Sequence, residues 1–167
     1  AAYFAALQGA GEIIMIGGTA SRLEMAKKFG VTTVLDRKQT SPEERKEIIM
    51  GLTGGRGVDY AIEAVGAPSA VKEGLALVRT GGAYLSVGFG DPNGSVEVDC
   101  FQDIGRKNLA YQGIWVSDAR HTRVALQGVL KNPSLFTALV SHRLPLAEAN
   151  LGLQLMDKKE ALKVVLV

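Results

Sequence analysis

The chain has 167 residues, of which 47% are apolar and 22% charged, and its formal net charge is +2. These values are close to the average of globular proteins, so they exclude a disordered or fibrous protein and allow one domain with a buried core. The small and dispersed charge argues against a nucleic-acid or anionic-membrane partner, and no apolar run reaches the roughly 20 residues of a membrane span.

In chain order, a helix-prone segment at residues 1–7 is followed by short apolar runs that alternate with helical patterns. Most of these runs lack polar alternates, which is typical of parallel strands buried on both faces. The strands predicted from them are 12–16, 33–35, 58–65, 83–87, 109–115, 139–143 and 162–167.

Helical patterns fill the intervals between the predicted strands. The sequence Ser-Pro-Glu-Glu at residues 41–44 is a capping box with proline at the first helical position, so a helix begins there and runs toward Met50. Further apolar stripes predict one helix around residues 71–78 and another after Pro145. Strands that alternate with helices in this way favour right-handed crossovers and an α/β fold with a doubly wound parallel sheet.

Three glycine clusters imitate the dinucleotide fingerprint G-x-G-x-x-G without matching it. The cluster at residues 9–11 precedes a predicted strand instead of following one, the cluster at 54–57 leads into a strand, and the cluster at 88–90 lacks the third glycine. We interpret all three as turns.

Five segments carry a resemblance to a known family: "EIIMIGGTASRLEMAKKFG", "GGRGVDYAIEAVGAPSA", "GGAYLSVGFG", "KNLAYQGIWVSDAR" and "LVSHRLPLAEANLGLQLMDKKEALKVVL". In this order they resemble the cofactor-binding half of zinc-containing medium-chain alcohol dehydrogenases. The resemblance implies a Rossmann-type sheet that lacks its first strand and glycine motif, and hence a C-terminal fragment. It also implies a nucleotide-binding domain at 1–140 and, at 141–167, a helix and strand that return toward a catalytic domain upstream.

The strand order of such sheets, 3-2-1-4-5-6, places the absent strand in the middle. The second and fourth strands then lose their shared neighbour, so we expect two open sheet edges. We also expect the chain by itself to be inactive as a dehydrogenase.

The glycine pair after the second family strand occupies the place where many dinucleotide folds carry a carboxylate for the adenosine ribose. Gly17 cannot repel a 2′-phosphate, and Gly18, Thr19 and Arg22 offer backbone, hydroxyl and guanidinium donors. NADP(H) is therefore permitted, and NAD(H) remains possible. A simpler interpretation stays open, in which the glycines form a tight turn and Arg22 lies on a solvated face.

The resemblance implies further cofactor contacts, because ligands of such sheets lie outside the carboxyl ends of the strands. They fall at three strand ends and at one lysine that replaces the family's pyrophosphate-binding arginine. The expected residues are Val65, Gly66, Val87, Gly88, Phe89, Ile114, Trp115 and Lys163.

His121, His142 and Cys100 are the only nitrogen and sulfur ligand candidates, and they are scattered singly. Their spacing does not match a zinc site, so we expect no metal ligand and no catalytic residue in this chain. We expect zinc only in the upstream domain, and we expect Cys100 to pack near Phe101 as a small apolar residue. A single cysteine and no leader-like start indicate a cytoplasmic protein.

The predicted function is the cofactor-binding part of an NAD(P)-dependent, zinc-containing alcohol dehydrogenase, which moves a hydride between an alcohol and a nicotinamide. Two alternatives remain: a zinc-free quinone oxidoreductase of the same superfamily, and a dinucleotide-binding module without chemistry. The apolar strand at 109–116 would be a sheet edge, which invites pairing with a second copy. In the family this strand joins two subunits, so we expect a homodimer, or a tetramer built from it.

Overall fold

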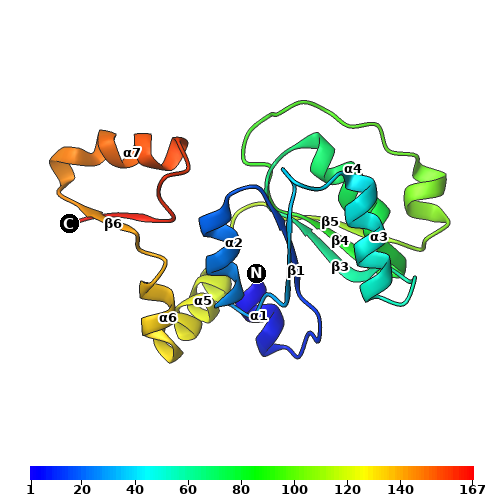
Figure 1. Ribbon diagram of the computed structural model, residues 1–167, viewed down its shortest axis with the longest axis horizontal. Coiled ribbons are helices and arrows are strands. Elements are labelled where there is room, and N and C mark those ends of the chain that lie inside the picture. Colours follow the sequence, from blue (N-terminus) through cyan, green and yellow to red (C-terminus); the bar gives the residue numbers. More distant parts are fainter. The chain divides into compact units, whose positions relative to one another are not determined.

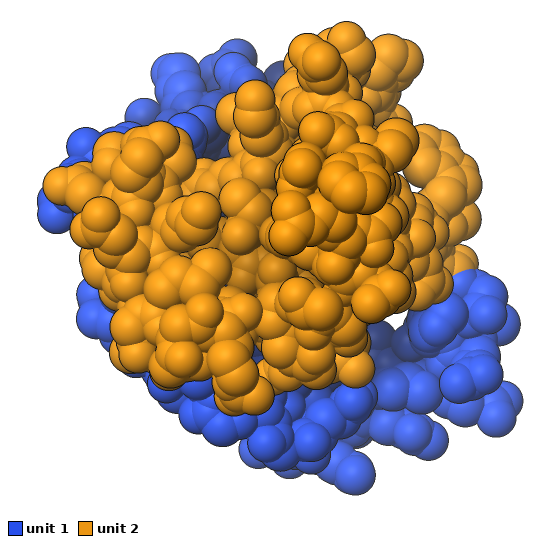
Figure 2. Space-filling model, turned by 90° about the vertical axis from the view of Figure 1, so that its right-hand side faces the viewer, with its two compact units in different colours: residues 1–40, 118–167 blue, residues 41–117 orange.

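The computed structural model describes residues 1–167, which form two compact units (Figure 2). Unit 1 comprises Ala1–Thr40 and Asp118–Val167, and unit 2 comprises Ser41–Ser117. None of the helices combines the length and the apolar character that crossing a membrane requires.

The first part of unit 1 is built around two parallel strands, β1 and β2. Its elements are α1 (Ala2–Leu7), β1 (Ile14–Gly17), α2 (Ala20–Lys27) and β2 (Thr33–Asp36). Ile14 lies opposite Thr33 and Gly17 lies opposite Asp36, so the two strands end side by side. Helix α2 crosses from one strand to the next and buries Leu23, as expected for a β-α-β crossover.

The second part of unit 1 carries a smaller parallel pair. Its elements are α5 (Ala119–Lys131), α6 (Pro133–Thr137), β6 (His142–Leu144), η2 (Leu146–Glu148), α7 (Ala149–Asp157) and β7 (Val164–Leu166). Strand β6 pairs with β7, with His142 opposite Val164. Edge-to-face contacts of Tyr3 with Phe136 and of Phe29 with Phe136 join the two parts of the unit.

Unit 2 is a three-stranded parallel sheet in the order β3-β4-β5 (Figure 1). Its elements are α3 (Pro42–Leu52), β3 (Val58–Glu63), α4 (Pro68–Leu77), β4 (Val78–Ser86), the π-helix η1 (Cys100–Gly105) and β5 (Ala110–Gly113). The core lies between α4 and one face of the sheet and consists of Val71, Leu75, Val78, Tyr84 and Leu109.

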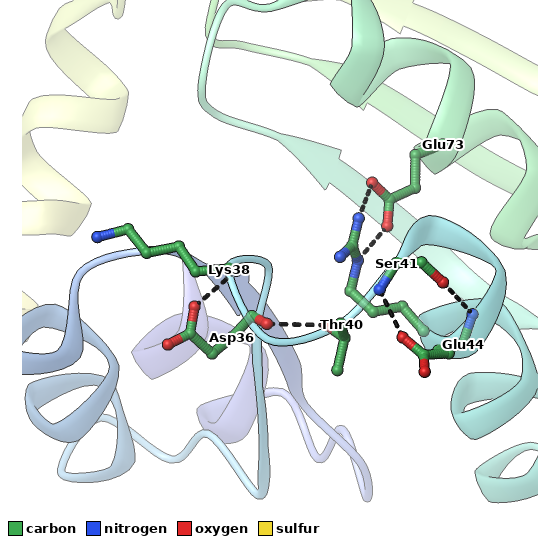
Figure 3. A network of polar contacts seen from close by, with 7 residues as sticks. Asp36, Lys38, Thr40, Ser41, Glu44 and Glu73 are labelled. Atoms are coloured by element: carbon green, nitrogen blue, oxygen red, sulfur yellow. Dashed lines mark hydrogen bonds and ion pairs between the residues drawn. The ribbon is translucent and has the colours of Figure 1, made fainter.

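A largely buried ion pair joins α3 and α4 of unit 2. The guanidinium of Arg45 on α3 donates to the carboxylate of Glu73 on α4 through Nε at 2.6 Å and Nη2 at 2.8 Å (Figure 3). Residue Arg45 is only 4% exposed. The bidentate geometry compensates part of the cost of burying the charge and fixes how α3 lies against α4.

Most of the predicted elements are present. All seven predicted strands coincide with or overlap the observed ones, and each observed pairing is parallel. The capping box is also confirmed, since Ser41 Oγ accepts from Glu44 N at 3.1 Å and Ser41 N donates to Glu44 Oε2 at 2.7 Å (Figure 3). As expected from the strand order, no ladder joins β1 to β3.

Three differences from the predictions have identifiable causes. Strand β4 begins at Val78, earlier than predicted, because the ladder with β3 starts there and then shifts register before Ala83. Helix α5 has a predominantly exposed apolar face, so its pattern suggested no buried element. Nothing in the residues around Cys100 signalled the short π-helix η1.

Candidate functional site

In unit 1 the candidate site lies at the carboxyl ends of β1 and β2. The N–H of Arg37 donates to Gly17 O at 2.8 Å, which continues the ladder one step beyond Asp36. A Cβ on Gly17 would lie 2.8 Å from Leu23 Cδ2, so a larger residue here would require the Leu23 side chain to shift. The predicted residues Gly17, Gly18 and Thr19 are therefore brought together at one strand end.

The side chain of Arg37 lies across Gly18. A Cβ on Gly18 would be 2.8 Å from Arg37 Nε and 3.2 Å from its Cγ, so the missing side chain makes room for the arginine. Thr19 is the N-cap of α2 but forms no side-chain capping bond. The Thr19 hydroxyl is therefore not used to cap the helix, so it can form a hydrogen bond with a ligand at this end of the strands.

The predicted candidate Arg22 lies in the first turn of α2, and its backbone N–H donates to Thr19 O at 3.0 Å. Its Nη2 donates to Ala161 O, at 3.4 Å, in the segment before β7. Arg37, which sequence reasoning missed, is the basic residue beside the glycine pair. The available signal was a basic residue immediately after the second predicted strand, but its relevance depends on the β1–β2 register.

A short ordered turn follows β2 and borders a cleft. Asp36 Oδ1 accepts from Lys38 N at 2.9 Å, and Asp36 O accepts from Thr40 Oγ1 at 2.8 Å (Figure 3). The cleft, about 350 Å³ in volume, is lined by residues of α2, β2 and this turn, including Leu23 and Leu35. A ligand at the strand ends of unit 1 thus has an adjoining concave surface with an apolar part.

In unit 2 a buried carboxylate shapes the turn at the end of β3. Glu63 Oε1 accepts from Val65 N at 2.6 Å and from Gly66 N at 2.7 Å. The amide of Asn93 donates to Gly66 O at 2.7 Å. Both backbone groups of Gly66 are thus held by side chains, which fixes the turn in one conformation.

The turns after β3 and β4 touch each other through glycine backbone. Gly66 has φ of +74°, a region that favours glycine. A Cβ on Gly66 would collide with Gly88 O, and a Cβ on Gly88 would collide with Gly66 N. The predicted residues Gly66 and Gly88 are therefore adjacent, and glycine is required at both.

The remaining predicted residues of unit 2 flank this contact. Ile114 N donates to Ser86 O at 2.8 Å, so the β4–β5 ladder continues to the predicted position. Side chains of Val65 and Trp115 are mostly exposed, at 71% and 70%. Val87 is exposed and Phe89 half-buried beside the core.

Two buried polar atoms of unit 2 have no hydrogen-bond partner: Glu63 Oε2 and the hydroxyl of Tyr84. Both side chains lie on the face of the sheet that α4 covers, because Ala61 pairs with Tyr84 and Glu63 pairs with Ser86. Burial raises the pKa of the Tyr84 hydroxyl, and the negative charge of Glu63 raises it further. Tyr84 is therefore a neutral phenol at ordinary pH.

Lys163 and the two histidines form contacts with neighbouring residues of unit 1. Lys163 is exposed, and its carbonyl accepts from Ser141 N at 3.0 Å. His121 Nδ1 lies 2.9 Å from Asp118 Oδ1, and His142 Nδ1 lies 2.9 Å from Ser141 Oγ.

No group of three or more His, Cys, Asp or Glu residues is placed to hold a metal ion. The expectation that Cys100 packs as an apolar residue is wrong, since both Cys100 and Phe101 are exposed. The first turn of η1 is instead fixed by Asp99, whose carboxylate accepts from Phe101 N and from Gln102 N.

Parallel strands joined by helices, with glycine turns gathered at their carboxyl ends, define a Rossmann-type α/β fold. The family model of the zinc-binding dehydrogenases matches residues 1–131. The chain belongs to this family.

Known relatives agree in fold and differ in the substrate that they are named for. L-Threonine 3-dehydrogenase of Bacillus velezensis is 32% identical over 160 residues, which cover 95% of this chain and 45% of the relative. 5-exo-Hydroxycamphor dehydrogenase of Pseudomonas putida is 30% identical over 164 residues, which cover 97% of this chain and 45% of the relative. The crystal structure of an alcohol dehydrogenase from Thermotoga maritima superposes with a TM-score of 0.94 at 41% identity, covering 99% of this chain and 45% of that one.

The chain spans about half the length of the relatives that it matches. The relatives are dehydrogenases, and their names include a threonine, a hydroxycamphor and an alcohol dehydrogenase. The names of these relatives therefore point to no single substrate.

Proposed function

We propose that this chain binds NAD(P)(H) as the cofactor-binding part of a zinc-dependent alcohol dehydrogenase. The observation that carries the proposal is the strand end of unit 1, where Gly17 and Gly18 leave the backbone open and Arg37 lies across Gly18. Glycine backbone beside a helix start and a guanidinium suits an anionic nucleotide. When bound, the dinucleotide supplies the hydride acceptor or donor for the reaction.

The proposal assigns the adenosine half of the cofactor to Gly17, Gly18, Thr19 and Arg37. Gly17 stands where a carboxylate would bind the ribose hydroxyls and repel a 2′-phosphate. The positive charge of Arg37 would attract a 2′-phosphate, whereas a carboxylate at Gly17 would repel it. We therefore propose that NADP(H) binds more tightly than NAD(H).

The proposal assigns the nicotinamide half to the strand ends of unit 2. Gly66 and Gly88 keep the backbone free of side chains there, and Glu63 holds the turn that contains Gly66 in place. Val65, Val87, Phe89, Ile114 and Trp115 complete this set of contacts. Lys163 remains a proposed contact for the pyrophosphate, and as a lysine it lacks the bidentate fork of an arginine.

Two variants that each remove one arginine test whether Arg37 binds the adenosine half of the cofactor. Titration of NADPH and NADH into the Arg37→Ala and Arg22→Ala variants, followed by nicotinamide fluorescence, separates the two arginines. We expect Arg37→Ala to weaken NADPH by about 1.5–3 kcal/mol, the range for hydrogen bonds to charged groups, and to leave NADH within twofold. Arg22→Ala should change neither cofactor strongly. Equal losses of NADPH and NADH in Arg37→Ala would reject the assignment.

We propose that residues 1–140 form the nucleotide-binding domain and that residues 141–167 form a helix and strand directed toward a catalytic domain. The residues of this chain do not fit a zinc site. The zinc ion and the alcohol are therefore proposed to bind elsewhere in the enzyme, and the chain itself to be inactive. Alcohol-dependent reduction of NADP⁺ by the purified 167-residue chain with added zinc would contradict this.

We propose that β5 pairs with β5 of a second copy. Strand β5 has a ladder partner on one side only, since the sheet order is β3-β4-β5. The exposed apolar residues Ile114, Trp115 and Val116 follow it directly. An apolar edge of this kind favours strand pairing between chains. We further propose a cytoplasmic location, because a lone Cys100 fits a reducing compartment.

A further inference from the structure

A cleft of about 350 Å³ lies at the amino ends of the strands of unit 2. Its walls come from α3, from the loop before β3, from the end of α4 and the start of β4, and from η1 and the segment that follows it. Four of the residues that line it are cationic: Lys46, Arg56, Arg79 and Lys107. Asp103 is the one acidic residue of its lining.

Two of these cations already have partners within unit 2. Lys107 Nζ donates to Leu75 O at 2.7 Å and to Val78 O at 3.3 Å, near the end of α4. Arg79 Nε lies 2.5 Å from Asp59 Oδ1, and its Nη1 donates to Thr80 O at 2.7 Å. The Nη2 donors of Arg79 are not used in these contacts.

Lys46 and Arg56 form no ion pair and are exposed. The lining has only one carboxylate, Asp103, whose Oδ2 accepts from Asp99 N at 3.0 Å, and a single negative charge does not balance the cations of the lining. Four cations therefore face two carboxylates, Asp59 and Asp103, so the cleft has an excess of positive charge.

Lys107 is partly buried and has charged neighbours of both signs. Burial lowers the pKa of its amine; the charge of Asp103 opposes this effect, and the charge of Lys46 adds to it. Lys46 and Lys107 therefore repel each other across the cleft. A bound anion would relieve this repulsion.

We propose that this cleft binds a small, multiply charged phosphate compound, held by Lys46, Arg56 and Arg79. The guanidinium groups match the oxygens of a phosphate, and the cleft volume is at the lower end of the range for ligand sites. The cleft is distinct from the proposed cofactor contacts, because Gly66 and Gly88 follow the opposite ends of β3 and β4. Strand β3 alone separates the two ends by roughly 20 Å.

Pyrophosphate is the probe for the test, because it is small and multiply charged. It is titrated into the purified chain and into chain saturated with NADPH, and binding is followed by calorimetry at about 0.1 M salt, where distant charges are screened. We expect a saturable site that binds pyrophosphate with equal affinity in both samples, because NADPH does not occupy it. Loss of binding in the NADPH-saturated sample would overturn the proposal, because the site would then belong to the cofactor.

Three single variants test residues of the cleft, and a fourth serves as the control. We expect Lys46→Ala and Arg56→Ala each to weaken pyrophosphate at least fivefold, and Asp103→Asn to strengthen it. Lys72→Ala is the matched control: Lys72 is an exposed residue of α4 outside the cleft, so its removal should change binding less than twofold. Circular dichroism establishes that each variant is folded. An equal loss in Lys72→Ala and Arg56→Ala, or unsaturable binding, would overturn the proposal and indicate general attraction of anions.

Discussion

The carboxylate of Glu63 is the residue on which the turn at the end of β3 depends. Its Oε1 accepts from two backbone N–H groups, those of Val65 and Gly66, and its side chain is buried. Glu63→Ala leaves both donors without this acceptor, which should lower the free energy of unfolding by about 2–3 kcal/mol. Urea unfolding followed by circular dichroism measures the loss.

Glu63→Gln is the control, because it keeps an acceptor oxygen and removes a buried charge. Its Oε2 position has no hydrogen-bond partner to lose. We expect Glu63→Gln to cost less than half as much as Glu63→Ala. If both variants were equally unstable, the turn would depend on the negative charge rather than on the acceptor.

At the scale of residues, the sequence predicted where glycine was needed but not which side chains the fold brings to those glycines. Gly17, Gly18, Gly66 and Gly88 all lie at strand ends, as expected from their place after apolar runs. The contact of Arg37 with Gly18 depends on the pairing of β1 with β2, and a pairing partner is not encoded locally. The same holds for Glu63, whose role appears only once the turn is formed.

The packing of α4 on the sheet depends on Gly74. A Cβ at this position would lie 2.6 Å from Tyr84 Cε2, and Tyr84 is completely buried. Gly74→Ala raises helix propensity by about 1 kcal/mol, but overpacking of this kind costs about 1–3 kcal/mol. We therefore expect a net loss of stability in thermal unfolding.

Gly51 in α3 provides the matched control for Gly74. A Cβ on Gly51 would meet no atom within 4 Å, so Gly51→Ala should gain stability, by about 0.5–1 kcal/mol. If Gly74→Ala lowers the stability and Gly51→Ala raises it, the effect of packing is separated from the effect of helix propensity. A gain in both variants would contradict the close approach of α4 to Tyr84.

The exposed edge of β5 makes a prediction about assembly. Trp115→Lys places a charge beside an edge that we propose to pair with a second copy, and charged residues oppose edge-to-edge pairing. We expect the mass measured by light scattering to fall from that of a dimer to that of a monomer. Leu52→Lys, at an exposed residue of α3, is the control and should leave the mass unchanged. A monomeric unmodified chain would contradict the proposed pairing.

At the scale of elements, the sequence predicted those helix and strand ends that are set by residues close together in the chain. The capping box of α3 requires only Ser41 and Glu44, and it formed as predicted. Helix α5 was missed although Asp118 caps it through His121 N, because one Asp is a weak start signal without an apolar stripe that faces a core. The early start of β4 depends on its ladder with β3, which the sequence of β4 alone does not specify.

At the scale of the whole molecule, the pairing of the strands was predicted from two sources together: the alternation of strands with helices, and the family resemblance. Alternation alone predicted parallel strands with helical crossovers, and the resemblance supplied their order. The observed pairings β1-β2 and β3-β4-β5 agree with that order, with no ladder between β1 and β3. The division into two compact units was not predicted, because it depends on contacts between residues 1–40 and 118–167 that no local pattern shows.

The strands differ in how well they are protected, and this predicts non-uniform local stability. Unit 2 contains the fully buried Tyr84 and Leu75, whereas all four residues of β1 are only half-buried and β6 pairs with β7 alone. An isolated two-stranded sheet is marginally stable, so β6 and β7 should open more readily than β4. In native-state hydrogen exchange we expect the amides of β4 to exchange at least about tenfold more slowly than those of β6 and β7. Uniform protection across these strands would show that the chain opens as one cooperative body, because opening free energies would then equal the global value everywhere.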